Sequence, residues 1–105
     1  MTPFTEKVIR IIQSIPEGKV MTYGSIAFAA GSPRGARQVV RILHSMSRKY
    51  NLPWHRVVNA KGMISLTEDE SNSMQKLQLL GEGVIFDEKH AIDLTRFQFF
   101  PDLTD

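Results

Sequence analysis

The stretch MTYGSIAFAAGSPRGARQVVRILHSM, residues 21–46, contains two helical patterns separated by only a tight turn. Thr22 can cap a first short helix and Gly31 can end it, because a hydroxyl accepts an amide at a helix start and glycine adopts the left-handed conformation at a helix end. Ser32 can then cap a second helix, with Pro33 at its first position. Two helices joined by a turn that contains glycine predict a helix-turn-helix.

The predicted second helix separates basic from apolar residues. At about 100° per residue, the basic side chains fall within an arc of roughly 80° and the apolar ones centre on the opposite side. The basic residues are Arg34, Arg37, Arg41, His44 and Arg48, and the apolar residues are Ala36, Val39, Val40, Leu43 and Met46. Gly35 and Ala36 are small enough to let the backbone approach a bulky partner closely. We interpret this helix as one that docks on nucleic acid.

The residues on either side predict a small, mainly helical domain. Phe4–Ile15 places its apolar residues on one helical face, with Pro3 in the first turn and Pro16 after the end. A further helix is expected over about residues 73–82. Its expected inward residues are Met74, Leu77 and Leu80.

Two segments are expected to supply β-structure. Val57–Ile64 has β-branched residues before the turn-forming Asn59–Gly62, which predicts a short hairpin. Residues 84–100 are rich in strand formers and predict a terminal β-element. A helix-turn-helix followed by a hairpin is a winged helix, so the expected class is mainly α with a small β-element. A chain of 105 residues suits a single domain, over residues 1–105.

Positive charge is concentrated in the first half of the chain. Residues 1–56 contain nine Lys and Arg and two acidic residues, whereas residues 57–105 contain four and nine. The net charge of +2 therefore combines a basic half of +7 with an acidic half of −5. A basic half favours a polyanion such as nucleic acid, because neutralising phosphates releases counterions. An ordinary solvated charged surface is the alternative.

Composition excludes several other classes. Cysteine is absent, which removes disulfides, thiolate metal sites and a cysteine nucleophile. The three scattered histidines lack the spacing of metal ligands, so neither a metal nor a cofactor is expected. No apolar run approaches the roughly 20 residues of a membrane span, and we expect a soluble, cytoplasmic protein without membrane contact.

Four motifs, in order, resemble the DNA-binding domain of the O6-alkylguanine-DNA alkyltransferases. They are MTYGSIAFAAG (21–31), GSPRGARQVV (31–40), PWHRVVNAKGMIS (53–65) and LLGEGV (79–84). The enzymes carry Pro-Cys-His-Arg-Val where this chain has PWHRV at residues 53–57. The pattern is most similar to the alkyltransferase-like proteins, which keep the fold but not the reaction. The resemblance covers roughly Phe4 to Val84.

The resemblance implies recognition without chemistry. An alkyltransferase flips the damaged base into a pocket and moves its alkyl group onto a thiolate that histidine and glutamate activate. His55 and Glu82 match these two residues, and they form either a purely structural pair or part of a binding site. Trp54 replaces the cysteine, and an indole nitrogen offers no useful nucleophilic lone pair. The implied lesion pocket consists of Trp54, Val57, His55 and Glu82.

The resemblance also implies how DNA is held. Tyr23 matches the tyrosine that crowds the phosphate beside the flipped nucleotide, and Arg37 matches the arginine that enters the stack where the base leaves. The second helix is implied to enter the minor groove. The expected DNA-binding residues are Tyr23, Arg34, Gly35, Ala36, Arg37 and Arg41.

Two features depart from the enzymes. Met46 stands where they usually place an asparagine that supports the active-site segment. Residues 65–73, SLTEDESNS, lack the Tyr-Ser-Gly-Gly run that helps to hold the base, and their acidic residues would repel phosphate if they faced DNA. The shape of the pocket lid and the lesion preference are therefore open at this point.

Three functions can be compared. The first is a DNA damage sensor that binds O6-alkylguanine in duplex DNA, flips the base and marks it for nucleotide excision repair, acting as a monomer. The second is a winged-helix transcription regulator that reads an operator, which explains the basic helix but not PWHRV or Glu82. The third is an enzyme with an unfamiliar nucleophile such as His55. The matching motifs favour the sensor.

Overall fold

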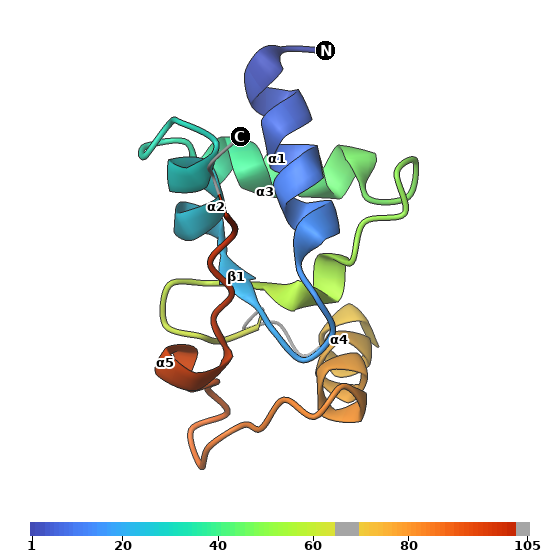
Figure 1. Ribbon diagram of the computed structural model, residues 1–105. Helices are drawn as coiled ribbons and strands as arrows, with labels where there is room; N and C mark the ends of the chain where they lie inside the picture. The colour runs from blue at the N-terminus through green and yellow to red at the C-terminus, as the bar shows by residue number, and fades with distance from the viewer. Residues whose placement is uncertain (65–69, 103–105) are drawn as a thin grey trace.

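A computed structural model describes residues 1–64 and 70–102, with the backbone alone for residues 70–73. The helices are α1 (Pro3–Ser14), α2 (Tyr23–Ala29), α3 (Ala36–Met46), α4 (Glu70–Gly81) and α5 (Leu94–Phe97), with a 3₁₀ turn η1 (Trp54–Arg56). The strands β1 (Met21–Thr22) and β2 (Val57–Val58) form one small sheet. Figure 1 shows α1, α2 and α3 at one end of the molecule and α4 and α5 at the other. The expected class, mainly helical with a small β-element, is confirmed.

Helix α1 begins and ends close to the predicted positions. Thr2 caps it by accepting the Thr5 amide at 3.2 Å, and Pro3 occupies its first turn. Ile12 is fully buried, and the Ile15 amide closes the helix by donating to the Ile12 carbonyl. The apolar face of α1 forms the floor on which α2 and α3 pack.

Helix α2 is the first helix of the predicted helix-turn-helix. Thr22 and Ser25 form a capping box, in which each side chain accepts the other residue's backbone amide at 3.0 Å. Ile26 and Ala27 are fully buried, as expected. Gly31 follows the helix with a φ of +93°, the left-handed conformation that stops it.

Helix α3 begins at Ala36, later than the predicted start at Pro33. Residues 32–35 form a turn instead, closed by the Gly35 amide donating to the Ser32 carbonyl at 2.8 Å, so Ser32 is not the N-cap. The buried face of α3 consists of Val39, Ile42 and Leu43. Val40, expected in the core, is exposed because the buried face is centred near Val39 and Val40 lies about 100° round the helix from it.

The β-structure differs from the expected hairpin. β2 pairs in parallel with β1, and the register places Met21 opposite Val57. The turn was predicted correctly, since the Gly62 amide donates to the Asn59 carbonyl at 3.0 Å. The strand before that turn nevertheless takes its partner from a segment much earlier in the chain. This pairing attaches η1, which immediately precedes β2, to the helix-turn-helix.

Helix α4 faces the opposite way from the prediction. Met74, Leu77 and Leu80 are 53%, 68% and 46% exposed, whereas Gln75 and Leu79 are buried. The Gln75 side chain donates to one backbone carbonyl of η1 at 3.2 Å and to one of β2 at 3.0 Å. These two hydrogen bonds and the packing of Leu79 set the rotation of α4 and leave the three apolar side chains outside.

The segment after α4 completes a second, smaller core. Val20 donates to the Phe97 carbonyl at 2.9 Å and accepts from the Phe99 amide at 2.8 Å, and Phe86 pairs with Ile92. The expected terminal β-element is therefore present as isolated bridges on either side of α5. Within the described part of the chain, no helix is long and apolar enough to cross a membrane.

Candidate nucleic-acid interface

The basic residues of the helix-turn-helix lie on the surface. Arg34 is exposed in the turn before α3, and Arg37 and Arg41 are exposed on the helix. His44 and Arg48 are also exposed and continue the same side. Because the opposite face of α3 packs on α1 and α2, these five side chains point away from the core. We refer to them as the basic strip.

Gly35 and Ala36 lie beside this strip, but Gly35 has a role inside the protein. Gly35 is buried, and a Cβ atom there would lie 3.0 Å from Cζ of Phe4. It would also lie 3.1 Å from the Ser32 carbonyl oxygen, so a side chain here would press on both α1 and the turn before α3. Ala36 is half-buried at the first position of α3. The contact of both residues with DNA stays a prediction.

Tyr23 is the first residue of α2 and is half-buried against the main core. Burial raises the pKa of its phenol above the ordinary value of 10.0, so the hydroxyl keeps its proton at neutral pH. A protonated phenol can donate a hydrogen bond to a phosphate oxygen. Its place in the helix-turn-helix is compatible with the predicted phosphate contact.

Trp54 begins η1 and is partly exposed at an open groove. Its ring meets the ring of His55 edge-on, with the centroids 6.3 Å apart. Both residues line the groove, whose volume is about 780 Å³. Ligand pockets commonly have volumes of about 300 to 1,000 Å³, so a nucleobase fits in one of this size. Further polar lining comes from Gln13 of α1, from Arg48, Tyr50 and Asn51 after α3, and from Gln78 of α4.

Glu82 joins three segments of the chain through its carboxylate. Its Oε2 lies 2.7 Å from Nε2 of His55, and Arg56 donates to both carboxylate oxygens at 2.7 to 3.2 Å. The Gly18 amide donates to Oε1 at 3.0 Å, while Nη1 of Arg56 donates to the Ile15 carbonyl at 2.9 Å. The network thus ties the turn after α1 to η1 and to the end of α4.

The surroundings of Glu82 keep it ionised. Burial alone would raise the pKa of this carboxyl group, but hydrogen bonds from Arg56, His55 and the Gly18 amide outweigh burial and lower the pKa to about 2. The carboxylate holds the imidazole of His55 in a defined orientation next to Trp54. Since the chain has no cysteine, the arrangement can shape a binding surface but cannot transfer an alkyl group to sulfur.

The structure brings Trp54, His55 and Glu82 together and sets Val57 apart. Val57 is buried in β2 and does not line the groove, so its predicted contact with a base stays a prediction.

Met46, a departure from the enzymes, is half-buried against the main core. Of residues 65–73, the first five lie outside the described residues. Within the described residues, no cluster of His, Asp or Glu side chains could hold a metal ion.

Sequence reasoning missed the groove lining from Gln13, Tyr50, Asn51 and Gln78, and it also missed two groups that hold the site in place. The Gly18 contact is made by a backbone amide, which leaves no signal in the side-chain pattern. Gln75 precedes Glu82 by seven residues, two helical turns, and therefore lies on the same side of α4. That spacing was available in the sequence, but the apolar residues of α4 indicated a different inward face.

The helix-turn-helix, the groove beside Trp54 and the His55–Glu82 pair define the class of this protein. It is a DNA-binding domain of the alkyltransferase type, in which tryptophan occupies the position of the alkyl-accepting cysteine. The family model for the 6-O-methylguanine DNA methyltransferase DNA-binding domain matches residues 3–84. The chain belongs to this family, as one of its alkyltransferase-like members.

Comparison with known relatives agrees with this assignment. The chain is 47% identical to the DNA base-flipping protein of Escherichia coli over 96 residues, which cover 91% of the chain and 74% of that protein. It is 41% identical to Alkyltransferase-like protein 1 of Schizosaccharomyces pombe over 80% of the chain and 79% of that protein. The crystal structure of S. pombe Atl1 with damaged DNA containing O6-carboxymethylguanine superimposes with a TM-score of 0.81 at 35% identity, covering 96% of this chain and 98% of that one.

Proposed function

We propose that this protein binds O6-alkylguanine in duplex DNA, flips the base without transferring its alkyl group, and marks the lesion for nucleotide excision repair. The observation that carries the proposal is Trp54, which stands at an open groove beside the His55–Glu82 pair, where the alkyltransferases hold cysteine. An indole has no useful nucleophilic lone pair, so the site can recognise a base but cannot accept its alkyl group.

The basic strip supplies the contact with the DNA backbone. Exposed guanidinium groups neutralise phosphates and release counterions, which gives affinity without sequence preference. Arg34, Arg37 and Arg41 begin this strip at the start of α3. Small Ala36 next to them lets the start of α3 approach the floor of the minor groove closely.

Base flipping needs groups that compensate for the lost stacking. Extruding a base costs a few kcal/mol, and an arginine that enters the vacated space offsets part of that cost. In the proposed mechanism Arg37 enters the stack, and Tyr23 donates to the phosphate beside the extruded nucleotide. Stacking of a base on Trp54 contributes about 1 to 3 kcal/mol.

The groove beside Trp54 accounts for selectivity toward an alkylated base. An alkyl group on guanine adds apolar area, which the indole ring can remove from water. His55, held by the Glu82 carboxylate, forms a rigid neighbouring wall. The proposal is supported by the relatives, because one is named a base-flipping protein and another is solved with DNA containing O6-carboxymethylguanine.

Recognition without alkyl transfer leaves the lesion in the DNA, so a second process must remove it. In the alkyltransferase-like family this process is nucleotide excision repair, and we propose the same for this protein. We also propose that it acts as a monomer, because its basic strip and groove come from one chain, and that it meets its DNA in the cytoplasm.

A fluorescence titration tests the proposal directly. Trp54 is the single tryptophan of the chain, so its emission reports on the groove. We expect a duplex with one O6-methylguanine to bind more tightly than the unmodified duplex and to change the emission as the base stacks on Trp54. Equal affinities with unchanged emission would rule out lesion recognition, and an added methyl mass on the protein would show that transfer occurs.

A further inference from the structure

Three basic residues lie around α5, apart from the basic strip. Nζ of Lys19 donates to the Arg96 carbonyl at 3.1 Å. Lys61 belongs to the turn after β2, and that turn packs against α5, because a Cβ atom on Gly62 would lie 3.3 Å from Cγ of Leu94. We refer to Lys19, Lys61 and Arg96 as the α5 basic patch.

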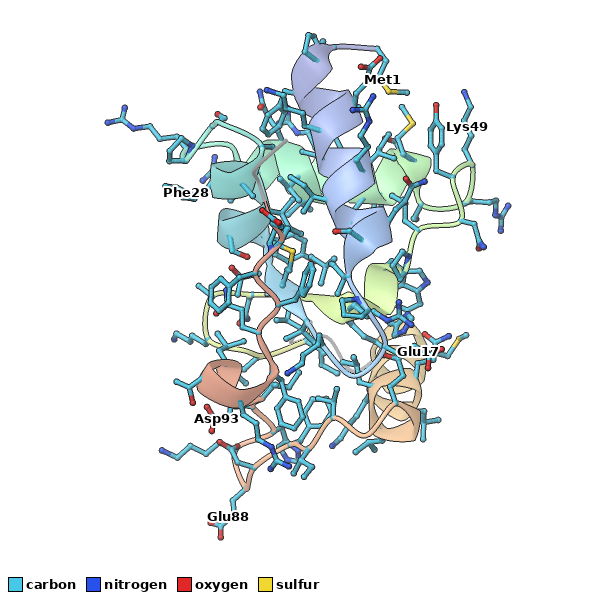
Figure 2. The ribbon with its side chains drawn as sticks, viewed as in Figure 1. Met1, Glu17, Phe28, Lys49, Glu88 and Asp93 are labelled. Carbon is cyan, nitrogen blue, oxygen red and sulfur yellow. The ribbon has the colours of Figure 1, made fainter. Side chains whose placement is uncertain are left out.

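The positive charge of the α5 basic patch is not neutralised locally. Within the described part of the chain, none of its three side chains forms an ion pair. Asp93, the acidic residue at the start of α5, accepts hydrogen bonds from the amide and the hydroxyl of Thr95. Figure 2 shows Glu88 farther out, at the tip of the molecule, and Glu17 on the side of α4. Three cations beside one carboxylate leave a local charge of +2.

Lys61 stands at the tip of a well-fixed turn. The side-chain oxygen of Asn59 accepts the amides of Lys61 at 2.9 Å and of Met63 at 3.0 Å. The Ile92 amide donates to the Gly62 carbonyl at 2.8 Å and holds the turn from the other side. The Lys61 side chain itself is exposed. A cation on a backbone that is already ordered can bind an anion with little further loss of backbone entropy.

The turn that carries Lys61 lies next to Tyr23. The strands β1 and β2 are parallel, with Thr22 opposite Val58, so Tyr23 and Asn59 leave the sheet at the same edge. Figure 1 shows α2, this turn and α5 following one another along one side of the molecule, with the turn before α3 on the same side. The α5 basic patch therefore continues the surface that begins with the helix-turn-helix.

A DNA duplex is long enough to cover both surfaces. The molecule extends 38 Å along its longest axis, which corresponds to about eleven base pairs at roughly 3.4 Å each. A duplex docked on α3 can thus reach α5 with the phosphates that follow the flipped nucleotide. Exposed lysine and arginine side chains bind such phosphates without reading the bases.

We propose that the α5 basic patch binds backbone phosphates of the same duplex, on one flank of the nucleotide that Tyr23 contacts. The inference rests on the proposed binding of duplex DNA and adds a second area to that interface. Arg96 lies outside residues 3–84, so this area extends past the part of the chain that the family model matches. Its role is to position the duplex, and the choice of base is left to the groove beside Trp54.

Lys61→Gln combined with Arg96→Gln tests the patch. Both side chains are exposed, and glutamine keeps a long polar side chain at each position. The double variant should bind the O6-methylguanine duplex and the unmodified duplex about tenfold more weakly, and the slope of log affinity against log salt should fall by about two units. The emission change of Trp54 at saturation should persist. Lys61→Arg combined with Arg96→Lys keeps both charges and should bind like the wild type.

Two controls separate a local contact from a change in overall charge. Lys7 and Arg10 are exposed on α1, whose inner face packs on α3. Lys7→Gln combined with Arg10→Gln removes the same charge away from the basic strip, and should change either affinity by about twofold or less. The second control shortens the duplex on one flank of the lesion at a time. Shortening one flank, and not the other, should abolish the difference between the wild type and the Lys61 and Arg96 double variant.

Four results would overturn the inference. Unchanged affinity and salt slope in the double variant, with the lesion preference intact, would remove the patch from the interface and leave the proposed function standing. A loss confined to the damaged duplex would place the two residues at the base. Equal weakening by the α1 control would reduce the effect to net charge. Binding to phosphatidylserine vesicles that is lost in the double variant, with unchanged DNA affinity, would assign the patch to a membrane.

Failure of the proposed function gives a different result. If the wild type binds damaged and unmodified duplexes equally, lesion recognition is wrong. The salt slope on the unmodified duplex then still shows whether Lys61 and Arg96 contact phosphates.

Discussion

Nε2 of His55 lies 2.7 Å from Oε2 of Glu82, and the chain contains no thiol for this pair to activate. In an alkyltransferase the corresponding pair supports the departure of a proton from cysteine. Here the same carboxylate also accepts hydrogen bonds from Arg56 and from a backbone amide. Its role in this structure is to hold these groups in position. The pair holds η1 in place and presents the His55 ring beside Trp54.

Glu82→Gln tests whether the carboxylate stabilises this arrangement. The neutral amide keeps the shape of the side chain but leaves the largely buried Arg56 without its counter-ion, which should lower the free energy of unfolding by roughly 3 kcal/mol. Urea denaturation measures the change. Glu88→Gln is the control, because that side chain is exposed and should shift stability by about 0.5 kcal/mol or less. Equal effects of the two substitutions would contradict the assigned role.

The pH dependence of stability should carry the signature of Glu82. Its pKa of about 2 lies below the ordinary 4.5, so the ionised group stabilises the folded state fully above pH 4.5 and loses this contribution as the pH falls toward 2. The stability difference between the wild type and Glu82→Gln should shrink over that interval. Asp87 and Asp93 also have lowered pKa values, but both proteins contain them and their effects cancel. A difference independent of pH would refute the prediction.

Arg37→Ala should affect lesion recognition more than general DNA binding. If Arg37 fills the space that the base leaves, its removal should weaken binding to the O6-methylguanine duplex about tenfold to a hundredfold. The Trp54 emission change should diminish in parallel. Unchanged affinity and emission would show that another group enters the stack.

Arg48→Ala, farther along the basic strip, serves as the matched comparison. A phosphate contact carries no information about the base, so its loss should weaken damaged and undamaged duplexes equally. The slope of log affinity against log salt should fall by about one unit. Because Arg48 also lines the groove, a selective loss for the damaged duplex would instead place it in contact with the base.

Gly35→Ala should be destabilising through its contact with Phe4. The new Cβ would lie 3.0 Å from Cζ of Phe4, and overpacking of this kind costs about 1 kcal/mol or more. Phe4→Leu in the same molecule should relieve the part of the overlap that involves Phe4, although the approach to the Ser32 carbonyl oxygen at 3.1 Å would remain. The two substitutions should therefore cost less together than the sum of their separate effects. Strict additivity in the double-mutant cycle would show that the residues do not press on each other.

Local signals in the sequence predicted the local parts of the fold. The predicted cap Thr22 and the left-handed Gly31 each act over a single turn, so the bounds of α2 follow from neighbouring residues alone. The predicted hairpin was wrong because the pairing of its first strand depends on a distant segment. Val57 pairs with Met21 across a long stretch of chain, and no property of the turn after it reveals that partner.

The inward face of α4 and the lining of the groove could not be predicted from residue patterns. Leu77 and its apolar neighbours were expected inside, because burial of apolar area usually decides how a helix turns. Gln75 and Glu82 decide it here, through hydrogen bonds to segments far away in sequence. Trp54, His55 and Glu82 were singled out by matching motifs, whereas the groove lining around Tyr50 depends on how a turn folds back on η1.

The hydrogen bonds between Val20 and residues 97 and 99 can form only after nearly the whole chain has been synthesised. On a ribosome, α1, α2 and α3 emerge together and are joined by contacts between near neighbours. The segment that flanks Val20 emerges only after α4, and until Glu82 appears Arg56 has no counter-ion. A nascent chain can therefore display its basic surface well before it finishes the groove beside Trp54.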